Sequence, residues 1–356
     1  MKITGFERTV LRVPFRPGIL PPPEYGEFAP PDQPFDRQSY PDSIATRCQD
    51  LLRLRTDQGV TGLGMSGPYY GRRDDAPPDW LGRDPLSFEP RQVVGGGWQM
   101  ALLDLIGKAL DQPLYRIFGG LAQPSIEVDY WIARMGPEDS AAAARTAVEQ
   151  GFTGLKFKCR WEDGDIVDRV IAILEAAPDL RVVVDPNRRF YTVENTLELA
   201  RQLEGRNVVF EDPIPRDDFN LYRRLKEETS IPIAPHLQTP REAIEVVHLG
   251  AADAFNIGPS DWMFGHMARI GEDGGLPVWM ASNVDLGLFD VFRLHAALAA
   301  PNCTFGSDIS GNFTHEHSLL AQPLVVNGRA AAPVGPGLGV ELDEEAIRRY
   351  TVAELS

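Results

Sequence analysis

Short apolar segments alternate with polar-faced helical stretches from residue 126 to residue 281, and this alternation constrains the fold more than any other feature of the sequence. The segments end about every 20-odd residues, a period too short for separate domains and typical of consecutive βα units. An open doubly wound sheet would give a similar rhythm, but no glycine-rich dinucleotide fingerprint follows any segment. The pattern therefore predicts an α/β fold of the parallel-barrel type. The predicted strands cover residues 128–133, 154–158, 182–185, 208–211, 232–236, 254–257 and 278–281.

The N-terminal part of the chain has a different pattern. Residues 1–13 and about 45–64 are predicted to form strands, with a turn at residues 56–59 inside the second range. A helix is predicted over residues 98–118, because apolar residues recur there at helical spacing and two glycines follow. Residues 14–43 are crowded with proline, glycine and acidic residues. This segment is too long for an ordinary connection, so it is a functional lid or a disordered insert, and we favour the lid.

Length, charge and cysteine content narrow the class of protein. A chain of 356 residues fits one large unit with a smaller one. The formal net charge of −16 disfavours nucleic acid and acidic membranes as partners, because both require basic patches. The three cysteines are scattered and suit a reducing compartment. No apolar run approaches the ~20 residues that span a bilayer, and the first residues do not resemble a signal peptide. We therefore expect a cytoplasmic protein.

Ionisable residues stand at the carboxyl ends of four successive predicted strands, where the loops of a barrel form the cleft. Each alone has an ordinary interpretation, since an aspartate there commonly caps a helix and a lysine is commonly a solvated surface charge. Lys156 and Lys158, however, are two residues apart, so in a strand both point the same way. Two buried ammonium groups are costly unless anions face them, and the next two strands supply carboxylates. The residues concerned are Lys156, Lys158, Asp185, Asn187, Glu211, Asp212 and His236.

Four motifs in this chain resemble those of a known family. The helix at 101–110 with the glycines at 119–120 resembles the end of that family's capping domain. Residues 151–158 resemble its strand with two lysines separated by one residue. Residues 184–187 and 210–213 resemble its third-strand aspartate and fourth-strand glutamate motifs. In this order and at this spacing, the chain resembles the mandelate racemase and muconate-lactonizing branches of the enolase superfamily over nearly its whole length.

The resemblance implies a two-part architecture. An α+β capping domain is expected from residues 1–125, and a (β/α)7β barrel of the TIM type from residues 126–325. Residues 326–356 are expected to return to the cap. The segment 14–43 then falls at the family's mobile lid, where Tyr25, Glu27 and Phe28 are placed near the substrate. We also expect a homo-oligomer.

The resemblance also implies the chemistry, which is abstraction of the proton α to a carboxylate of a small-molecule substrate. Mg²⁺ is the expected cofactor, because it stabilises the resulting enediolate as a Lewis acid. Asp185 and Glu211 are carried over as metal ligands, Lys158 as the base and Lys156 as its electrostatic partner. Residues expected to support these groups or to contact substrate are Asn187, Asp212, Gln238 and Tyr25.

The fifth predicted strand departs from the family pattern. It normally ends in a carboxylate that is the third metal ligand, whereas this chain has His236. Imidazole is a softer ligand than a carboxylate and removes one negative charge, so Mn²⁺ or another divalent metal such as Zn²⁺ becomes an alternative to Mg²⁺. Gln238 is a second candidate for the same role.

The sixth and seventh predicted strands also depart from the pattern. The family's second bases would stand near Gly258 and Met280, and neither residue can transfer a proton. Chemistry on one face of the substrate remains, and dehydration of a hydroxy acid, such as a sugar acid or a hydroxyproline-like acid, is our first interpretation. A cycloisomerase or epimerase of the same family is the alternative, as is a degenerate member that binds a ligand without turnover. Candidates for help from the eighth strand and its loop are Asp308, His315, Glu316 and His317, although the run at 315–317 is equally compatible with a surface loop. Asp285 and Asp290 are expected to cap a helix or to support the site.

Overall fold

The computed structural model of the protein describes residues 1–19, 48–69, 78–89, 91 and 96–355. Tyr25 and most of the predicted lid at 14–43 lie outside the described residues. The strands are β1 (Ile3–Leu11), β2 (Cys48–Thr56), β3 (Thr61–Tyr69), β4 (Ser125–Glu127), β5 (Tyr130–Ile132), β6 (Gly154–Lys158), β7 (Arg181–Asp185), β8 (Val208–Glu211), β9 (Ile233–Ala234), β10 (His236–Leu237), β11 (Phe255–Ile257), β12 (Val278–Met280), β13 (Val325–Val326), β14 (Arg329–Ala331) and β15 (Thr351–Leu355). The α-helices are α1 (Gly96–Ala109), α2 (Leu114–Phe118), α3 (Pro137–Glu149), α4 (Ile166–Ala176), α5 (Val193–Leu203), α6 (Phe219–Glu228), α7 (Pro240–Leu249), α8 (Trp262–Asp273), α9 (Gly287–Leu298), α10 (Gly311–Thr314) and α11 (Glu344–Tyr350), with 3-10 turns η3 (Pro85–Ser87) and η4 (Trp161–Asp163).

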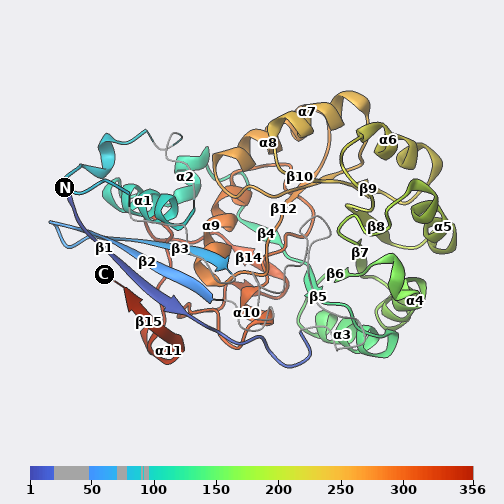
Figure 1. The fold of residues 1–356 in the computed structure, drawn as a ribbon, viewed down its shortest axis with the longest axis horizontal. Helices are drawn as coiled ribbons and strands as arrows, with labels where there is room; N and C mark the ends of the chain where they lie inside the picture. Colours follow the sequence, from blue (N-terminus) through green and yellow to red (C-terminus); the bar gives the residue numbers. More distant parts are fainter. Residues whose placement is uncertain (20–47, 70–77, 90, 92–95, 356) are drawn as a thin grey trace, which may run out of the picture.

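The two ends of the described chain meet in one antiparallel sheet of order β15-β1-β2-β3 (Figure 1). Helix α1 packs closely on β3, and two glycines of that strand permit the approach. A Cβ on Gly62 would lie 2.1 Å from the carbonyl oxygen of Ala101, and one on Gly64 would lie 2.0 Å from that of Gly97. Any side chain at either position would therefore push the helix away from the sheet.

The helix predicted over residues 98–118 is two helices in the structure, α1 and α2. Asp111 takes a left-handed conformation with φ 51°, which ends the first helix. Pro113 follows, and it cannot donate the backbone hydrogen bond that a continuous helix would need. The prediction of one uninterrupted helix was therefore wrong between residues 110 and 113.

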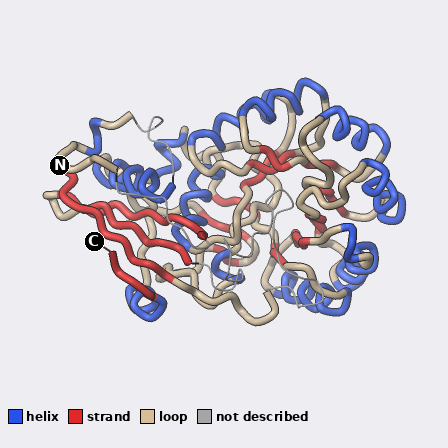
Figure 2. Tube along the Cα trace, viewed as in Figure 1, coloured by secondary structure: helices blue, strands red, loops and turns tan. Residues whose placement is uncertain are grey.

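The central part of the chain has the α/β arrangement that the sequence predicts. Parallel strands form a five-stranded sheet, β5-β6-β7-β8-β9, and a three-stranded sheet, β10-β11-β12. Helices α3 to α8 lie in an arc on the outer side of these strands, as Figures 1 and 2 show. The fifth predicted strand is split into β9 and β10 at Pro235. Isolated parallel bridges join Val128 to Ser307 and Val278 to Cys303, so the segment at 303–307 contacts strands of both sheets.

The side chains of these strands alternate between two layers. Those that face the helices, such as Phe157, Phe210 and Met280, belong to the large core between the strands and the helices. Those that face the other way form a small separate cluster of buried residues: Val183, Val209, Ala234, Ala254 and Trp279. Because strand residues two apart point the same way, Asp185, Glu211 and Asn256 lie on the same side as this inner cluster, one step towards the carboxyl ends of the strands.

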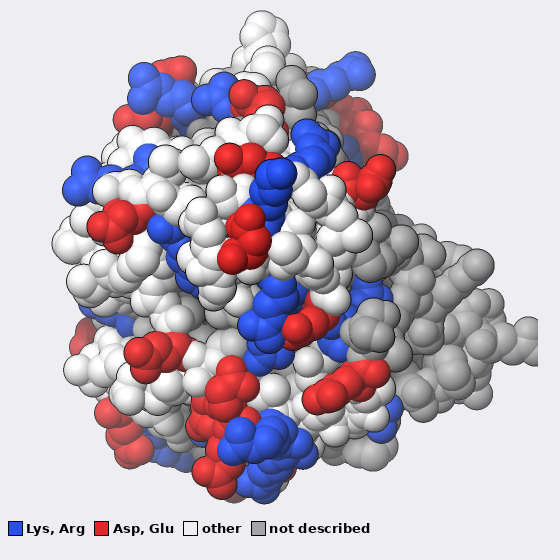
Figure 3. Space-filling view, turned by 90° about the vertical axis from the view of Figure 1, so that its left-hand side faces the viewer, with Lys and Arg blue, Asp and Glu red and all other residues white. Residues whose placement is uncertain are grey.

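The surface over the antiparallel sheet carries charges of both signs. Figure 3 shows lysine and arginine interspersed with aspartate and glutamate over this face. Exposed pairs there include Arg55 with Glu7 at 2.7 Å and Arg53 with Glu344 at 3.2 Å. None of the helices in the described ranges is both long and apolar enough to span a bilayer.

Candidate active site

The ammonium group of Lys156 lies at the centre of a buried cluster of carboxylates. Its Nζ is 2.7 Å from Glu211 Oε2, 2.7 Å from Asp308 Oδ2 and 3.1 Å from Asp185 Oδ2. Lys156 is 3% exposed, and Asp185 and Glu211 are fully buried. Burial alone would lower the pKa of Lys156, but Asp308, Glu211 and Asp185 together raise it well above its usual value. Lys156 is therefore a permanent cation in this cluster.

Lys158 contacts the same cluster from the carboxyl end of β6. It pairs in register with Asp185 of β7, and its ammonium group forms a short ion pair with Asp185 Oδ2. Burial would raise the pKa of Asp185, but Lys158 and Lys156 hold it below its usual value. The second oxygen, Oδ1, accepts a hydrogen bond of 2.9 Å from the backbone N–H of Asn187. Asn187 thus orients the carboxylate through its backbone, in a turn where its φ is 48°.

Two further residues belong to the cluster: Asp308, which the sequence analysis named without choosing it as a site residue, and Asn256, which it did not name. The amide nitrogen of Asn256 donates to Glu211 Oε1 and to Asp308 Oδ2, both at 3.3 Å. Burial, and then the neighbouring Asp185, raise the pKa of Glu211 well above its usual value. Asp308 follows the segment that bridges to β12, an irregular stretch with no strand pattern. Asn256 of β11 could have been found from the sequence, because it is two residues after Ala254 and so faces the same side of the strands.

Asp212 holds the turn after β8 in shape. Its Oδ1 lies 3.3 Å from Arg216 Nε and accepts hydrogen bonds from the Tyr222 hydroxyl at 3.2 Å and the His236 backbone N–H at 3.3 Å. Asp212 takes a left-handed φ of 47°, and burial raises its pKa to about 6. The residue connects the end of β8 to the start of β10, and so fixes Glu211 relative to His236.

His236 and Gln238 form a pair on the other side of the cluster. The side-chain amide of Gln238 lies 2.7 Å from His236 Nε2, at hydrogen-bond distance. Removal from water, and then the Arg216 and Lys156 cations, lower the pKa of His236 to about 3. The imidazole is therefore neutral at physiological pH. Gln238 also stands over Gly258, because a Cβ on that glycine would lie 2.3 Å from Gln238 Nε2.

The structure corrects the position of Met280. Its side chain packs in the core between strands and helices, whereas Trp279 belongs to the inner cluster. The inward positions of β12 and the residue after it are therefore Trp279 and Ala281. Neither side chain transfers protons in the neutral range, so the conclusion that this strand supplies no base is unchanged although the residue named was wrong.

The other candidate residues lie at separate places. His315 is buried, with its ring 4.3 Å from that of Phe15, so of the alternatives considered for it the exposed surface loop does not hold. His317 is 3.4 Å from Asp343, and Glu316 accepts a hydrogen bond from Tyr350. Asp285 and Asp290 flank the buried Arg293, at 2.5 Å and 3.8 Å from its Nη1.

The donor atoms of the central cluster suit a hard divalent cation. Asp185 and Glu211 are buried carboxylates, and Asp308 Oδ1 and Asn256 Oδ1 are buried without a hydrogen-bond partner within the described ranges. Oxygen donors of this kind are those that Mg²⁺ and Mn²⁺ prefer. In the arrangement seen here, no three or more His, Cys, Asp or Glu side chains of the described residues could hold a metal ion. The Lys156 ammonium lies between the carboxylates, and the imidazole of His236 faces Gln238.

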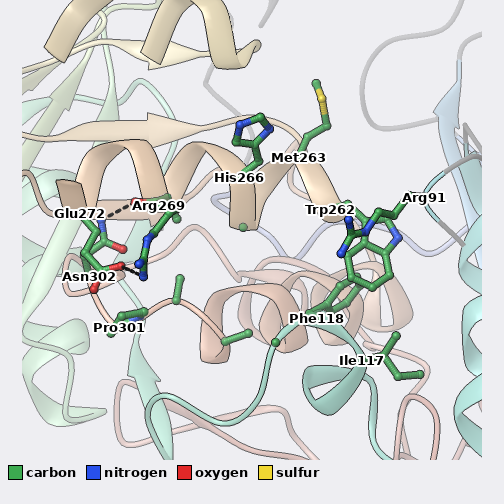
Figure 4. A pocket seen from close by; sticks show the side chains of 15 residues that line it. Arg91, Ile117, Phe118, Trp262, Met263, His266, Arg269, Glu272, Pro301 and Asn302 are labelled. Carbon is green, nitrogen blue, oxygen red and sulfur yellow. Dashed lines mark hydrogen bonds and ion pairs between the residues drawn. The ribbon is translucent and has the colours of Figure 1, made fainter. Parts of the chain in front are cut away.

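A surface pocket of about 510 Å³ lies apart from this cluster, and none of the residues above lines it. Figure 4 shows Trp262, Met263 and His266 of α8 on one side and Phe118 of α2 on another. The guanidinium of Arg91 lies 5.5 Å from the centre of the Trp262 ring. The pocket is thus on the outer surface of the helices, and the candidate chemistry is at the strand ends.

The family model described as "Enolase C-terminal domain-like" matches residues 139–346 of this chain. The chain is 28% identical over 338 residues to the N-succinylamino acid racemase of Thermus thermophilus, covering 85% of this chain and 89% of that protein. It is 28% identical over 333 residues to the arabinonate dehydratase of Saccharolobus solfataricus, with coverage of 87% and 86%. The crystal structure of 2-chloromuconate cycloisomerase from Rhodococcus opacus superposes with a TM-score of 0.81 at 24% identity, covering 99% of this chain and 100% of that one.

These relatives include a racemase, a dehydratase and a cycloisomerase, and the family model spans more than half of the chain. An isomerase or a lyase is therefore the class of enzyme that the similarity supports. The two lysines on β6, the aspartate on β7 and the glutamate on β8 lie together at the strand ends, where the sequence motifs place them. The chain belongs to the enolase superfamily, in its mandelate racemase and muconate-lactonizing branch.

Proposed function

We propose that this protein is a divalent-metal-dependent dehydratase of a hydroxy acid, in which Lys158 removes the proton α to the substrate carboxylate. The observation that carries the proposal is the asymmetry of the site. Lys158 reaches the carboxylate cluster from β6, whereas the residue after β11 is Gly258, and the side chain of Gln238 fills the space in front of it. A reaction that needs one acid–base group is therefore favoured over one that needs two.

Asp185 and Glu211 would hold the metal, with His236 as the proposed third ligand. A divalent cation at these residues would offset the negative charge that develops on the substrate carboxylate. Lys156 adds a fixed positive charge beside them, because three carboxylates keep it protonated. Asn187 and Asp212 keep the two strand ends in place through their backbone turns and hydrogen bonds.

Dehydration needs one group that takes a proton and then returns it. Lys158 accepts the α-proton at Nζ, and the carbon–oxygen bond at the β-carbon breaks. The ammonium of Lys158 then gives the proton to the departing hydroxide, so water leaves and the enzyme returns to its starting state. Both transfers occur on one face of the substrate, as the single base requires.

The architecture that supports this site is also part of the proposal. We infer that the segment at 303–308 completes a (β/α)7β barrel, since Asp308 N donates to Met280 O at 2.9 Å and Asp129 N to Ser307 O at 3.2 Å. We propose that residues 1–125 and 326–356 form the cap and residues 126–325 the barrel. The pairing of β1 with β15 supports the return of the C-terminus to the cap.

The alternative is a cycloisomerase or epimerase of the same family. Cycloisomerisation also requires one acid–base group, and the printed names of the relatives include cycloisomerases and racemases. Epimerisation would require a donor on the face that Gln238 occupies. The third hypothesis is a family member that binds a carboxylate without turning it over.

Conversion of a hydroxy-acid library tests the proposal. The protein loaded with Mg²⁺ or Mn²⁺ would be incubated with sugar acids and hydroxyproline-like acids, and loss of water would be followed by mass spectrometry. We expect one group of acids to lose water in the native protein and in Lys226→Ala, an exchange at a lysine that pairs with Asp253 on the outer surface. Lys158→Ala should abolish the product. Ring closure or epimerisation without water loss would support the alternative function. If no carboxylate reacts, the hypothesis of a protein that binds a carboxylate without turnover would be supported instead.

A further inference from the structure

A buried carboxylate lies at the amino ends of the parallel strands, where the proposed function assigns it no role. Asp129, the residue before β5, is 2% exposed, and its Oδ1 lies 2.7 Å from Nη2 of Arg181, the first residue of β7. Burial raises the pKa of Asp129 to about 6, although Arg181 opposes this shift, so the pair is ionic at physiological pH. The molecule thus keeps a charged carboxylate buried at the end of the strands opposite to Lys158.

Two glycines from neighbouring segments press on this carboxylate. A Cβ on Gly154 of β6 would lie 2.0 Å from Asp129 Oδ1, and one on Gly306 would lie 1.9 Å from the same atom. Real Cβ atoms do not come so close to another heavy atom, so neither position accepts a side chain while Asp129 is in place. The carboxylate therefore fills the gap between β6 and the segment at 303–308.

The two glycines stand one step below the ion pair of Lys156 with Asp308. Lys156 follows Gly154 by two residues and Asp308 follows Gly306 by two, so in an extended chain the members of each pair point the same way. The upper residues meet at 2.7 Å, between Lys156 Nζ and Asp308 Oδ2, and the lower ones meet at the carboxylate of Asp129. The separation of the two chains at the lower level therefore sets their separation at the ion pair.

Arg181 ties the segment at 303–308 to β7. Isolated bridges, rather than a ladder of strand pairs, join this segment to its neighbours. The guanidinium of Arg181 lies 4.9 Å from the centre of the Phe305 ring, and that ring stacks on Trp279 at 5.2 Å. Arg181 thus binds Asp129 and covers Phe305 at the same time, which holds the carboxylate and the segment in one arrangement.

We propose that Asp129, held by Arg181, is a positioning residue that fixes Asp308 against the ammonium of Lys156. This inference deepens the proposed function, because Lys156 is the fixed cation of that site and Asp308 is one of the three carboxylates around it. With Asp308 in place, the ammonium is shared, and the two proposed metal ligands do not hold it alone. Asp129 therefore acts on the site from below, through the spacing of two chains.

Nuclear magnetic resonance of the lysine ammonium groups tests the inference in the metal-free protein. The chain contains five lysines, at positions 2, 108, 156, 158 and 226, so labelling lysine with nitrogen-15 gives a simple spectrum. The Lys156 signal is identified by its absence from Lys156→Met. Its protons should exchange slowly with water in the native protein, because the ammonium is buried among three carboxylates.

Three variants separate the position of Asp129 from its charge. In Asp129→Ala the Lys156 ammonium should exchange roughly 10- to 100-fold faster, as expected when a hydrogen bond to a charged group is lost. Asp129→Asn keeps the shape and one acceptor for Arg181, so it should retain most of the protection. Both variants remove the charge, so an effect of charge alone would be equal in the two. Gly306→Ala keeps every charge but displaces the segment, and should accelerate exchange as Asp129→Ala does.

The chain offers a matched control and an internal reference. Asp253 is a carboxylate two residues before β11 that pairs with Lys226 at 3.1 Å. Asp253→Ala should affect the Lys226 signal and leave the exchange of Lys156 as in the native protein. Lys108 of α1, which pairs with Asp104 at 2.6 Å, lies on another element and should be unchanged in every variant.

Several results would overturn the positioning role. One is a native Lys156 ammonium that already exchanges as fast as that of the exposed Lys2. Others are unchanged exchange in Asp129→Ala and Gly306→Ala, or equal acceleration in Asp129→Ala and Asp129→Asn. Faster exchange at Lys108 together with Lys156 would show a general loosening of the fold and would also overturn it.

The test needs neither metal nor substrate, so its outcome is separate from that of the proposed function. If Lys156 responds as expected but no hydroxy acid loses water, the proposed dehydration fails while the positioning role of Asp129 stands. If dehydration is found and Lys156 does not respond to Asp129→Ala, the positioning role fails while the proposed function stands.

Discussion

The side chain of Gln238 occupies the space in front of Gly258. A Cβ on Gly258 would lie 2.3 Å from Gln238 Nε2 and 2.4 Å from its Oε1, and the same amide is 2.7 Å from His236 Nε2. Gly258 has no side chain that could act as a base, and Gln238 fills the space that a longer side chain at this position would occupy. An amide does not titrate in the neutral range, so this face of the site provides no proton acceptor of its own at that point.

This relationship predicts how a second base could be introduced. Gly258→Lys alone should displace Gln238 and break its hydrogen bond with His236. In the double variant Gly258→Lys with Gln238→Ala, room is made for the lysine, and an acid–base group then stands opposite Lys158. We expect the double variant to exchange the α-proton in D₂O with partial inversion, which nuclear magnetic resonance of a chiral acid would detect. Gln238→Ala by itself is the control and should give no inversion, and a double variant without inversion would contradict the assigned geometry.

The cluster around Lys156 predicts a strong dependence of stability on its charge. Removing one partner from a buried ion pair typically costs about 3–5 kcal/mol, and Lys156→Met would leave three buried carboxylates without their ammonium. Urea denaturation of the metal-free variant should show a loss of this size. Mn²⁺ should recover part of it, because the cation would replace the lost charge. Lys226→Met, at a half-exposed pair with Asp253, should cost about 1 kcal/mol or less. A Lys156→Met protein as stable as the control would contradict the account.

The proposed ligands predict two different metal phenotypes. Asp185→Asn removes a charged oxygen donor from the buried cluster, so elemental analysis of the dialysed protein should find no stoichiometric metal. His236→Asp replaces a nitrogen donor with a harder oxygen, so it should retain metal and shift the preference from Mn²⁺ towards Mg²⁺. An unchanged preference would indicate that His236 is not a ligand. Asp308, which shares the Lys156 ammonium with Glu211, would then be the next residue to exchange.

Asp290 predicts a loss of stability as the pH rises. Burial, and then the neighbouring Asp285, raise its pKa from 3.8 to about 7. Between these values the folded protein holds the proton more tightly than the unfolded chain, so the stabilisation is complete below about pH 4 and is lost as the pH approaches 7. The effect is at most about 4 kcal/mol. Asp290→Asn, which mimics the protonated form, should therefore have a flatter urea-denaturation stability from pH 5 to pH 8. The same slope in both proteins would show that another group is responsible.

Much of the central fold could be predicted because its signal is local. The strands β6, β7 and β8 were expected within one residue of their observed ends, since each is a short apolar run that stops at a charged residue. The break of the fifth strand at Pro235 and the break of the helix at Asp111 were missed. The left-handed conformation of Asp111 depends on the surrounding backbone, which an apolar pattern does not report. Pro113 and Pro235 stand in the sequence, but the apolar pattern continues across them and concealed the breaks.

The site was predictable where its residues follow regular strands. Lys156, Lys158, Asp185 and Glu211 end such strands, and alternation alone places them on one side. Asp308 follows an irregular segment that joins two strands only through isolated bridges, so no periodicity identified it. Met280 was assigned to the wrong layer because one residue of error in a strand reverses the direction of every side chain. The contact of Gln238 with Gly258 depends on how two neighbouring strands pack, which no single motif encodes.

The configuration of the α-carbon after exchange in D₂O tests the central claim most directly. A chiral carboxylate that the metal-loaded enzyme binds but cannot dehydrate would be incubated in D₂O and its α-carbon analysed for deuterium and for configuration. With Lys158 as the single base, deuterium should enter with retention, and Lys158→Ala should slow exchange by about 10²–10⁴ while the metal stays bound. Deuterium that enters with inversion, or exchange that persists at the native rate in Lys158→Ala, would contradict the one-base account.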